Sequence, residues 1–211
     1  MIEVEVNHSE RLGPSRNQGK RPTCLAFAAS DLNAFGHSTE HLSVEYLCHF
    51  AAKSAEGWQP GDGFTTEQVF SALARSGQPS EQIYPYQSDM HDAPLRAPPA
   101  NLLPLYPGNA KVRNFTPEDV LIELRAGRAV GTVLAVTQSL FYPKDGIVEF
   151  DPFVIPNQFH ALVAVGVGAH MQTQETHVLL RNSWGACWGL QGHAWVSEGH
   201  LRLHMQEGFS L

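Results

Sequence analysis

The chain has little cysteine: its 211 residues include only three, Cys24, Cys48 and Cys187. An odd and sparse set does not form the disulfide framework of a small secreted domain. None of the three has the spacing of a zinc site. We therefore expect no metal and no organic cofactor, and the scarcity of cysteine predicts a reducing, cytoplasmic location.

Long apolar runs are also absent. No segment has enough consecutive apolar residues to span a bilayer, so no membrane partner is expected. The acidic, alternating N-terminus from Met1 to Val6 lacks the basic start and the apolar run of a secretory signal. A signal or pro-segment removed from a longer precursor stays open as an alternative.

Positive charge is in the minority. The chain has 14 Lys and Arg against 21 Asp and Glu, which gives a formal net charge of −7. No basic cluster overrides this balance, which argues against a nucleic-acid partner. The hydrophobic fraction of 43% and the length allow a substantial core, in one domain or in two closely joined halves.

The first half of the sequence has the pattern of helices. From Cys24 to about Phe35 the chain is rich in Ala and Leu, with apolar residues repeating on one face. Ser43, Thr65 and Thr116 are suited to cap later helices, and the last is followed by Pro at the first helical position. Helices are therefore expected at residues 24–35, 44–52, 66–76 and 117–126.

The second half has the pattern of strands, with β-branched residues in apolar or alternating runs. Between the halves, residues 78–110 are rich in Pro, Asn and Gly and predict a long loop. The tail at residues 199–211 has no clear pattern. Helices followed by strands indicate an α+β fold. Strands are expected at residues 129–136, 161–167, 177–180 and 193–196.

Three short stretches, far apart in the sequence, contain the side chains of one kind of catalytic apparatus. A thiolate can attack an acyl carbon and an imidazole can move its proton, while side-chain amides can orient the ring and donate to an oxyanion. The combination predicts acyl transfer by a sulfur nucleophile. The stretches are Asn17-Gln18-Gly19 leading to Cys24, Phe159-His160-Ala161, and Arg181-Asn182-Ser183-Trp184-Gly185.

These stretches resemble the motifs of papain-like cysteine peptidases. Residues 17–27 are similar to the motif around the nucleophile, residues 160–168 to the histidine strand, and residues 182–192 to the motif around the asparagine. Tyr84-Pro85-Tyr86 matches a further tripeptide of the family. The resemblance covers about residues 14–196. It implies a helical lobe and an antiparallel β-barrel lobe, with the active site in the cleft between them.

The implied division of the chain places a helical lobe with the nucleophile at residues 8–110. A β-barrel lobe with His160 and Asn182 follows at residues 111–211. Residues 1–7 are expected to pack on the β lobe. Together the two lobes would form one catalytic domain.

Cys24 lies where the first long helix is expected to begin. Unpaired backbone N–H groups and the positive end of the helix dipole stabilise a thiolate at such a position. Taken alone, a cysteine in an Ala-rich helix is as often a buried structural residue. The downstream motifs favour the nucleophile, whereas Cys48 and Cys187 lack such a setting and are expected to be structural.

The resemblance assigns His160 the role of general base and Asn182 that of its orienting partner. Gln18 would donate to the oxyanion together with the backbone N–H of Cys24. Each has a plainer interpretation, as an edge-strand histidine, a turn-forming asparagine and a solvated loop glutamine. Trp184 favours the catalytic interpretation, because an indole can shield the His–Asn hydrogen bond from water. A thiolate and an imidazolium are the expected resting pair.

Several positions depart from the family pattern. The run from Pro14 to Phe27 is most similar to bacterial members without disulfides, and Arg21 stands where secreted members have a half-cystine. Leu25 replaces a Trp, Pro22 replaces a Gly, and Phe159 replaces the acid that plant enzymes have beside the histidine. These departures bear on specificity and pH optimum and leave the reaction class unchanged.

The resemblance also implies a substrate-binding surface. Glycines allow an extended substrate backbone to approach and pair. Apolar residues would form a pocket for the residue one before the scissile one, although they would fit equally well in a core. Trp188 belongs either to the wall beyond the scissile bond or to packing. The residues concerned are Gly61, Gly63, Phe64, Val133, Ala161, Trp184 and Trp188.

The sequence therefore predicts a cysteine peptidase that cleaves peptides or proteins through a thioester. Two alternatives stay open: a specialised amidase, deamidase or transpeptidase with the same chemistry, and a low-activity peptide-binding module on the peptidase fold. Because Cys24 lies close to the start of the chain, no inhibitory pro-segment is expected. A regulatory protein partner or a limited cleft would then restrain activity, unless the chain is a fragment of a longer one.

Overall fold

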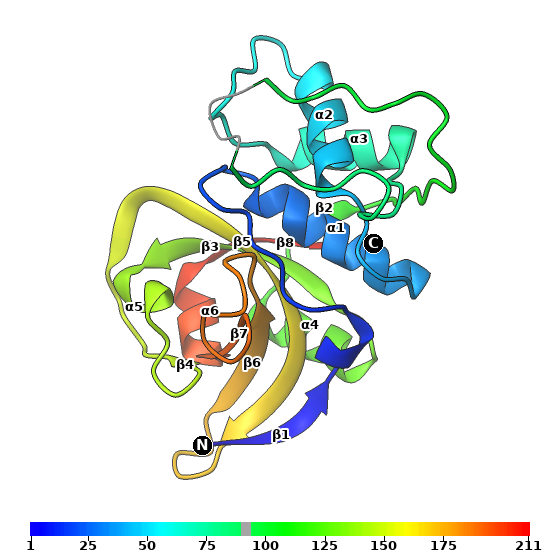
Figure 1. Cartoon of the computed structure of the whole chain (residues 1–211). Helices are drawn as coiled ribbons and strands as arrows, with labels where there is room; N and C mark the ends of the chain where they lie inside the picture. The colour runs from blue at the N-terminus through cyan, green and yellow to red at the C-terminus, as the bar shows by residue number, and fades with distance from the viewer. Residues whose placement is uncertain (90–93) are drawn as a thin grey trace.

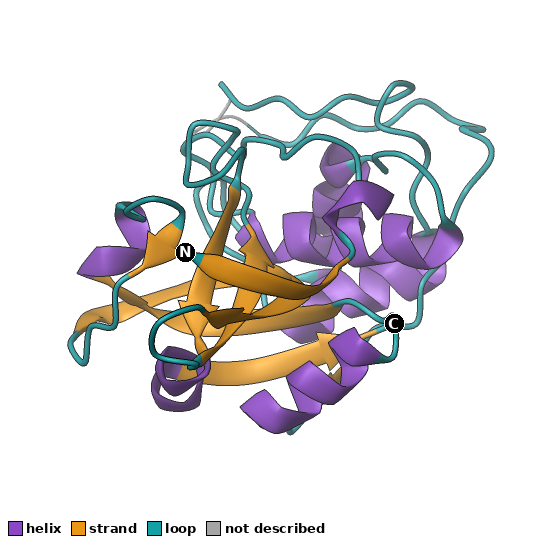
Figure 2. Cartoon of the chain, turned by 90° about the horizontal axis from the view of Figure 1, so that it is seen from below, coloured by secondary structure: helices purple, strands orange, loops and turns teal. Residues whose placement is uncertain are grey.

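The structure is a computed structural model, and it describes residues 1–89 and 94–211. Three helices lie together in one region: α1 (Cys24–His37), α2 (Val44–Ser54) and α3 (Thr66–Ser76) (Figure 1). The other region is a β-sheet against which α4 (Pro117–Arg125) and α6 (Glu198–His204) pack. Figure 2 shows the same division from below. The fold is α+β, with a helical N-terminal region and a β-sheet C-terminal region.

Capping residues set where the predicted helices begin. Ser43 caps α2 with its side chain, and Thr65 forms a capping box at the start of α3. Thr116 forms another capping box at the start of α4, where Pro117 is in the first turn. Each cap satisfies a backbone N–H that the helix itself leaves free, which stabilises the fold by about 1 kcal/mol. The predicted starts of these three helices are confirmed.

The sheet has eight strands in the order β2-β8-β3-β5-β6-β7-β4, and β1 pairs with β5 off that path. All pairs are antiparallel except the short pair of β4 with β7, which is parallel. Among the described residues, strand pairing ends at β2 and β4 and does not close. The strands are β1 (Ile2–Asn7), β2 (Lys111–Arg113), β3 (Val130–Thr137), β4 (Ile147–Val148), β5 (Val154–His170), β6 (Thr176–Arg181), β7 (His193–Ser197) and β8 (Met205–Ser210).

The strands expected from the sequence omit β1, β2, β4, the first part of β5 and the last strand, β8. Residues 154–160 belong to β5, although their side chains are mostly exposed and therefore show no apolar alternation. The tail without a clear pattern contains α6 and β8. In β8 only Gly208 and Phe209 are buried, and a Cβ on Gly208 would lie 2.6 Å from the Phe115 ring. Close packing against a residue distant in sequence, rather than periodicity, defines this strand.

Helix α1 is shared by the two regions. Every residue from Leu25 to Phe35 is buried, so the helix is covered on all sides rather than on the one face that its periodicity predicts. It packs against α2 and α3 on one side and against β5 and β3 on the other (Figure 1). Full burial of a large apolar side chain contributes about 1.5–3 kcal/mol. This packing fixes the first residue of α1, Cys24, where the helices meet the sheet.

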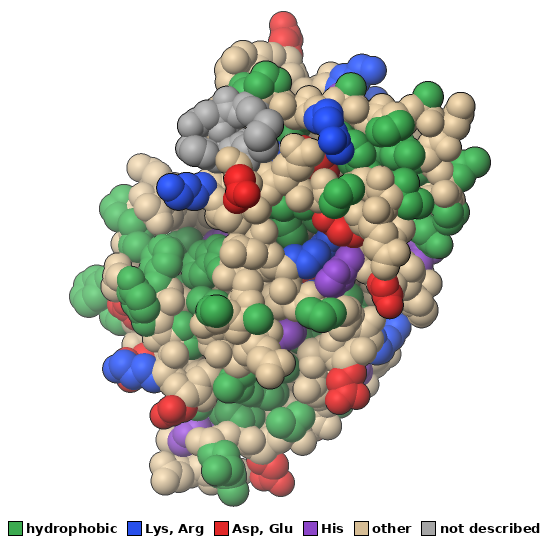
Figure 3. Space-filling model, viewed as in Figure 1, with side chains coloured by type: hydrophobic (Ala, Val, Ile, Leu, Met, Phe, Trp, Pro, Cys, Tyr) green, Lys and Arg blue, Asp and Glu red, His purple; other side chains and the backbone are tan. Residues whose placement is uncertain are grey.

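The predicted loop at residues 78–110 is confirmed where it is described, with residues 90–93 outside the described ranges. No described helix is long and apolar enough to cross a membrane. Within the same ranges no three His, Cys, Asp or Glu side chains come together as a metal site. On the face seen in Figure 3, acidic and basic side chains are interspersed.

Candidate active site

Cys24 is the first residue of α1, and its side chain is partly buried. The preceding residue, Thr23, makes no side-chain cap to the helix, and its hydroxyl lies 2.7 Å from the Tyr86 hydroxyl. First-turn N–H groups have no acceptor within an α-helix, and that of Leu25 hydrogen-bonds the Cys24 sulfur. The sulfur therefore lies at the positive end of the helix dipole, as the sequence predicts.

His160 comes from β5, and its side chain is close enough to the Cys24 thiol to lower the pKa of that thiol. Its ring is buried, and its Nε2 lies 2.6 Å from Asn182 Oδ1. The backbone N–H of Ser183 donates to the same Oδ1 at 2.7 Å, which identifies that atom as an acceptor. Nε2 therefore carries the hydrogen, and Nδ1 is the nitrogen left for the thiol.

Asn182 directly follows β6, and both its backbone and its side chain are fixed. Its N–H donates to Gly192 O at 2.9 Å, and its carbonyl accepts from Ser15 Oγ at 2.6 Å. The residue is only 2% exposed, so little room is left for the amide to turn. The amide oxygen holds the His160 ring in one orientation.

The surroundings of Cys24 favour its charged form. Burial raises the pKa of the thiol, but the hydrogen bond and charge of His160 and the N–H groups of Ala161 and Leu25 lower it. The lowering effects win, so the pKa lies below the ordinary value of a thiol. Burial instead raises the pKa of Cys48, which keeps that thiol protonated.

We expect iodoacetamide to alkylate Cys24 at pH values well below those at which an ordinary thiol, of pKa about 8.5, stops reacting. The pKa is lowered, so the reactive thiolate persists as the pH falls and is lost only when it is finally protonated. Mass spectrometry of the Cys24 peptide across about pH 4–10 measures the rate.

His160→Ala removes the hydrogen bond and the charge that lower the pKa, so it should move the alkylation profile to higher pH. A single midpoint near the ordinary value, equal in both proteins, would contradict the assembled site.

Gln18 lies beside the loop that leads to the nucleophile and is 7% exposed. Its Nε2 donates to Arg21 O at 2.8 Å, and its Oε1 accepts from Ser183 Oγ at 2.7 Å. A side-chain amide has two N–H hydrogens, so one remains to donate elsewhere. Since the other hydrogen and the oxygen are both held, the remaining N–H has a fixed direction, as an oxyanion donor requires.

Trp184 lies against His160, and Trp188 lies against Trp184. The Trp184 ring lies 4.4 Å from the His160 ring, centroid to centroid, and Phe141 stacks on its other side at 5.2 Å. Trp188 is buried, and its Nε1 donates to Leu140 O at 2.9 Å. Trp184 is therefore placed to cover the histidine, whereas Trp188 packs edge-on against Trp184, with ring centroids 5.9 Å apart.

The glycine-rich part of the predicted substrate wall lies against the nucleophile loop. A Cβ on Gly63 would lie 3.6 Å from Pro22 O, so the two backbones are close. Gly61 has a φ of +95°, a conformation that favours glycine. Phe64 stacks on Trp58, with ring centroids 5.6 Å apart and planes 5° apart.

The remaining predicted pocket residues come from the sheet. Val133 in β3 pairs with Ala161 in β5. Ala161 is buried within a hydrophobic cluster against which Val133, Phe64 and Cys24 pack, and these last three are partly buried. The predicted pocket residues and the nucleophile thus pack against one hydrophobic cluster.

Sequence reasoning missed the part played by Ser183. Its hydroxyl donates to Gln18 Oε1, and its backbone N–H donates to Asn182 Oδ1. One residue thus orients both amides of the site. A serine after a candidate asparagine gives little indication of this, because Gln18 is far away in the sequence.

Arg21 also has a structural part that the sequence did not indicate. Its guanidinium forms a buried ion pair with Glu45 at 2.5 Å and donates to Gln87 O at 3.0 Å. The carbonyl of the same residue accepts from Gln18 Nε2. Arg21 therefore ties the nucleophile loop to α2. By the sequence resemblance, this is the position at which secreted members of the family have a half-cystine.

Comparison with known proteins gives matches over nearly the whole chain. The family model described as papain family cysteine protease matches residues 3–209. Cathepsin J of Mus musculus is 29% identical over 207 residues, which cover 89% of this chain and 57% of that protein. Cathepsin K of Mus musculus is 27% identical over 195 residues, covering 86% of this chain and 55% of that protein. The chain thus spans little more than half the length of these relatives.

Solved structures share the fold. Digestive procathepsin L 3 of the Tenebrio molitor larval midgut has a TM-score of 0.77 and 18% identity, covering 100% of this chain and 71% of its own. A structure concerning the mite allergens Blo t 1 and Der p 1 has a TM-score of 0.75 and 22% identity, with coverages of 100% and 71%. At these identities the likeness is one of fold.

Proposed function

The chain belongs to the papain family of cysteine proteases, and from this we propose that it hydrolyses peptide bonds through a thioester on Cys24. The observation that carries the proposal is the row of Cys24, His160 and Asn182, in which His160 lowers the pKa of the thiol and hydrogen-bonds Asn182 Oδ1 at 2.6 Å. It places a thiol of lowered pKa against an imidazole whose tautomer is fixed by an amide. Gln18 lies in the same site with one N–H free to donate.

Acylation begins when the Cys24 thiolate attacks the scissile carbonyl carbon. A C–S bond forms as the carbonyl π electrons move to oxygen, and the free N–H of Gln18 and the backbone N–H of Cys24 stabilise the oxyanion. His160, as an imidazolium, protonates the leaving nitrogen through Nδ1, and collapse of the oxyanion re-forms the carbonyl and breaks the C–N bond. The amine departs and leaves a thioester beside a neutral imidazole.

Deacylation reverses these roles. Water attacks the thioester carbon and gives a proton to His160 Nδ1, and collapse of the oxyanion breaks the C–S bond. The carboxylic acid product leaves, and the thiolate–imidazolium pair is restored. Asn182 holds Nε2 throughout, so Nδ1 faces the reacting atoms in both steps.

The position of His160, the proton donor to the leaving group, suggests how a substrate lies in the site. Because His160 protonates the leaving nitrogen, the part of the substrate after the scissile bond would lie towards Trp184 and Phe141. The part before it would run along Gly63, with an apolar side chain reaching Phe64. We propose peptide or protein substrates with an apolar residue one position before the residue whose carbonyl is cleaved.

An irreversible thiol-directed peptide probe tests the proposed function directly. The probe should label Cys24 alone among the three cysteines, as read by mass spectrometry of the digest. A profile of cleaved peptides should then show hydrolysis with apolar residues preferred one position before the new C-terminal residue. Labelling without any turnover would favour the binding module, and products joined to an added amine would favour the transpeptidase.

Gln18→Ala should lower kcat by about 10²–10³ with little change in KM, because the lost N–H acts on the oxyanion of the transition state. The alkylation profile of Cys24 should stay close to that of the wild type, since alkylation forms no oxyanion. Steady-state kinetics on a fluorogenic peptide measures the first effect. A loss expressed only in KM would assign Gln18 to substrate binding instead.

We further propose that this is a disulfide-free member that works in a reducing compartment. All three cysteines lie among the described residues and are free. The buried pair of Arg21 and Glu45 supplies a noncovalent tie at the nucleophile loop. The bacterial origin and cytoplasmic location stay predictions, and the relatives named above are rodent proteins. Thiol counting on the unfolded, unreduced protein should find three free thiols.

A further inference from the structure

A buried charged cluster lies between α1 and the chain segments that carry Gln18 and Asn182. The Asp31 carboxylate accepts from Arg16 at 2.6 Å and from Arg181 at 2.8 Å. The side chains are 8%, 10% and 1% exposed for Asp31, Arg16 and Arg181. Charges so far from water require their partners, because an unpaired buried charge is strongly unfavourable.

The two arginines belong to segments that are joined to each other at the active site. Arg16 comes just before Gln18, and Arg181 comes directly before Asn182. The backbone N–H of Gln18 donates to Ser183 O at 2.8 Å, and Ser183 Oγ donates to Gln18 Oε1 at 2.7 Å. The oxyanion donor and the orienting amide therefore form one rigid unit, called here the amide unit.

Asp31 connects the amide unit to the helix of the nucleophile. It lies about two turns after the start of α1 and hence on the same helix face as the thiol. One carboxylate oxygen holds Arg16 and the other holds Arg181, one arginine from each segment. Arg16 also lies 3.5 Å from Glu81, and the charges of the cluster act on two further titratable groups, His41 and His193.

The two arginines favour the ionised form of the carboxylate. Burial raises the pKa of Asp31, but the charges of Arg181 and Arg16 and their hydrogen bonds outweigh burial and bring it to about 2. The link between α1 and the amide unit is therefore an ionic one at neutral pH.

We propose that Asp31 is a positioning residue for catalysis, whose carboxylate sets where the amide unit lies relative to Cys24. A displacement of about 1 Å in such a unit can lower a rate by about 10² while the fold persists. A cluster that only stabilised the fold would affect the melting temperature and leave the chemistry of folded molecules unchanged. The proposal rests on the proposed function for its kcat readout, whereas its alkylation readout needs no substrate.

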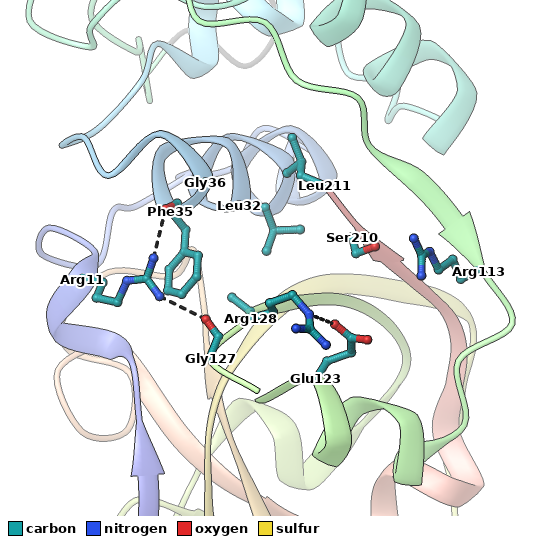
Figure 4. Close-up of a pocket in the computed structure, with 11 residues that line it drawn as sticks. Arg11, Leu32, Phe35, Gly36, Arg113, Glu123, Gly127, Arg128, Ser210 and Leu211 are labelled. Carbon is teal, nitrogen blue, oxygen red and sulfur yellow. Dashed lines mark hydrogen bonds and ion pairs between the residues drawn. The ribbon is translucent and has the colours of Figure 1, made fainter. Parts of the chain in front are cut away.

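Arg11, which lies at the far end of α1, provides a comparison with Arg16. Arg11 donates to Phe35 O at 3.5 Å and to Gly127 O at 3.0 Å, beside a cavity of about 470 Å³ (Figure 4). It joins the end of α1 to the chain segment that follows α4, and no proposed catalytic residue lines this cavity. Substitution of Arg11 therefore tests the loss of a contact made by α1 without altering the amide unit.

Asp31→Asn keeps the size of the side chain and removes its charge. We expect kcat to fall by about 10² with KM nearly unchanged. The alkylation midpoint of Cys24 should move to higher pH, because a displaced Asn182 no longer holds the His160 ring against the sulfur. Leu124→Ala, a fully buried position in α4, is the control for lost stability. It should lower the melting temperature while the kcat and alkylation profile of folded molecules stay at wild-type values.

Arg16→Gln provides a milder variant in which Asp31 keeps Arg181 as its partner, should Asp31→Asn not fold. It should lower kcat by about tenfold or more, whereas Arg11→Gln should leave kcat unchanged. Wild-type kcat and alkylation in folded Asp31→Asn, or in Arg16→Gln, would overturn the proposal. Should the wild type hydrolyse no peptide, the proposed function fails, and the alkylation shift still decides the part of Asp31.

Discussion

Cys24→Ala is expected to lower kcat/KM by about 10⁴–10⁶ and to leave the fold intact. Without the sulfur no thioester can form, and the remaining amides can stabilise only a direct attack by water. The side chain is partly buried at the start of α1, so its removal leaves a small cavity and should cost about 1 kcal/mol or less. Turnover of a fluorogenic peptide and a thermal melt measure the two effects.

The other two cysteines are the controls for this substitution. Cys48 is fully buried and has a raised pKa, so it is not a thiolate nucleophile, and Cys187 is an exposed residue. Cys187→Ser and Cys48→Ala should keep most of the activity. Were either as damaging as Cys24→Ala in a folded protein, the nucleophile would have to be reassigned.

His160→Ala should lower kcat/KM by about 10³–10⁴, because the base, the acid and the partner of the thiolate are lost together. Asn182→Ala should cost only about 10–10². Without the amide, the His160 ring remains beneath Trp184 and reaches its working orientation part of the time. Steady-state kinetics of the two variants on one substrate gives both losses.

The double variant distinguishes an orienting amide from one that acts on the substrate. If Asn182 acts only through His160, the double variant should be no worse than His160→Ala alone. Losses that multiply in the double variant would show that Asn182 has a separate function. Melting temperatures of all three variants serve as the check on folding.

The local structure of the helices could be predicted from the sequence because it depends on neighbouring residues. The caps at Ser43, Thr65 and Thr116 act within one turn of the helices they begin. The same applies to the placement of Cys24 at a helix start, which follows from the Ala- and Leu-rich run after it. Burial of α1 on every side could not be predicted, since both of its covering layers come from distant segments.

The strands were predicted only where burial gives them a pattern. Residues 161–167 are buried within β5 and were found, whereas the exposed first part of the same strand was not. The last strand, β8, was missed because its contribution to the core is the packing of Gly208 on Phe115 and the burial of Phe209. Pairing with β3 and β2 determines it, and pairing partners cannot be read from a single segment.

By itself the sequence determined the family, the four side chains proposed for catalysis and the helix start that lowers the pKa of Cys24. These depend on residue types at short, fixed spacings, which a chain displays before it folds. Only the tertiary structure decided how the four are held: Ser183 joins the two amides, and Asp31 ties their segments to α1. The reason is that hydrogen bonds and ion pairs between distant segments form wherever packing brings the partners together, and no local pattern of residues encodes that meeting.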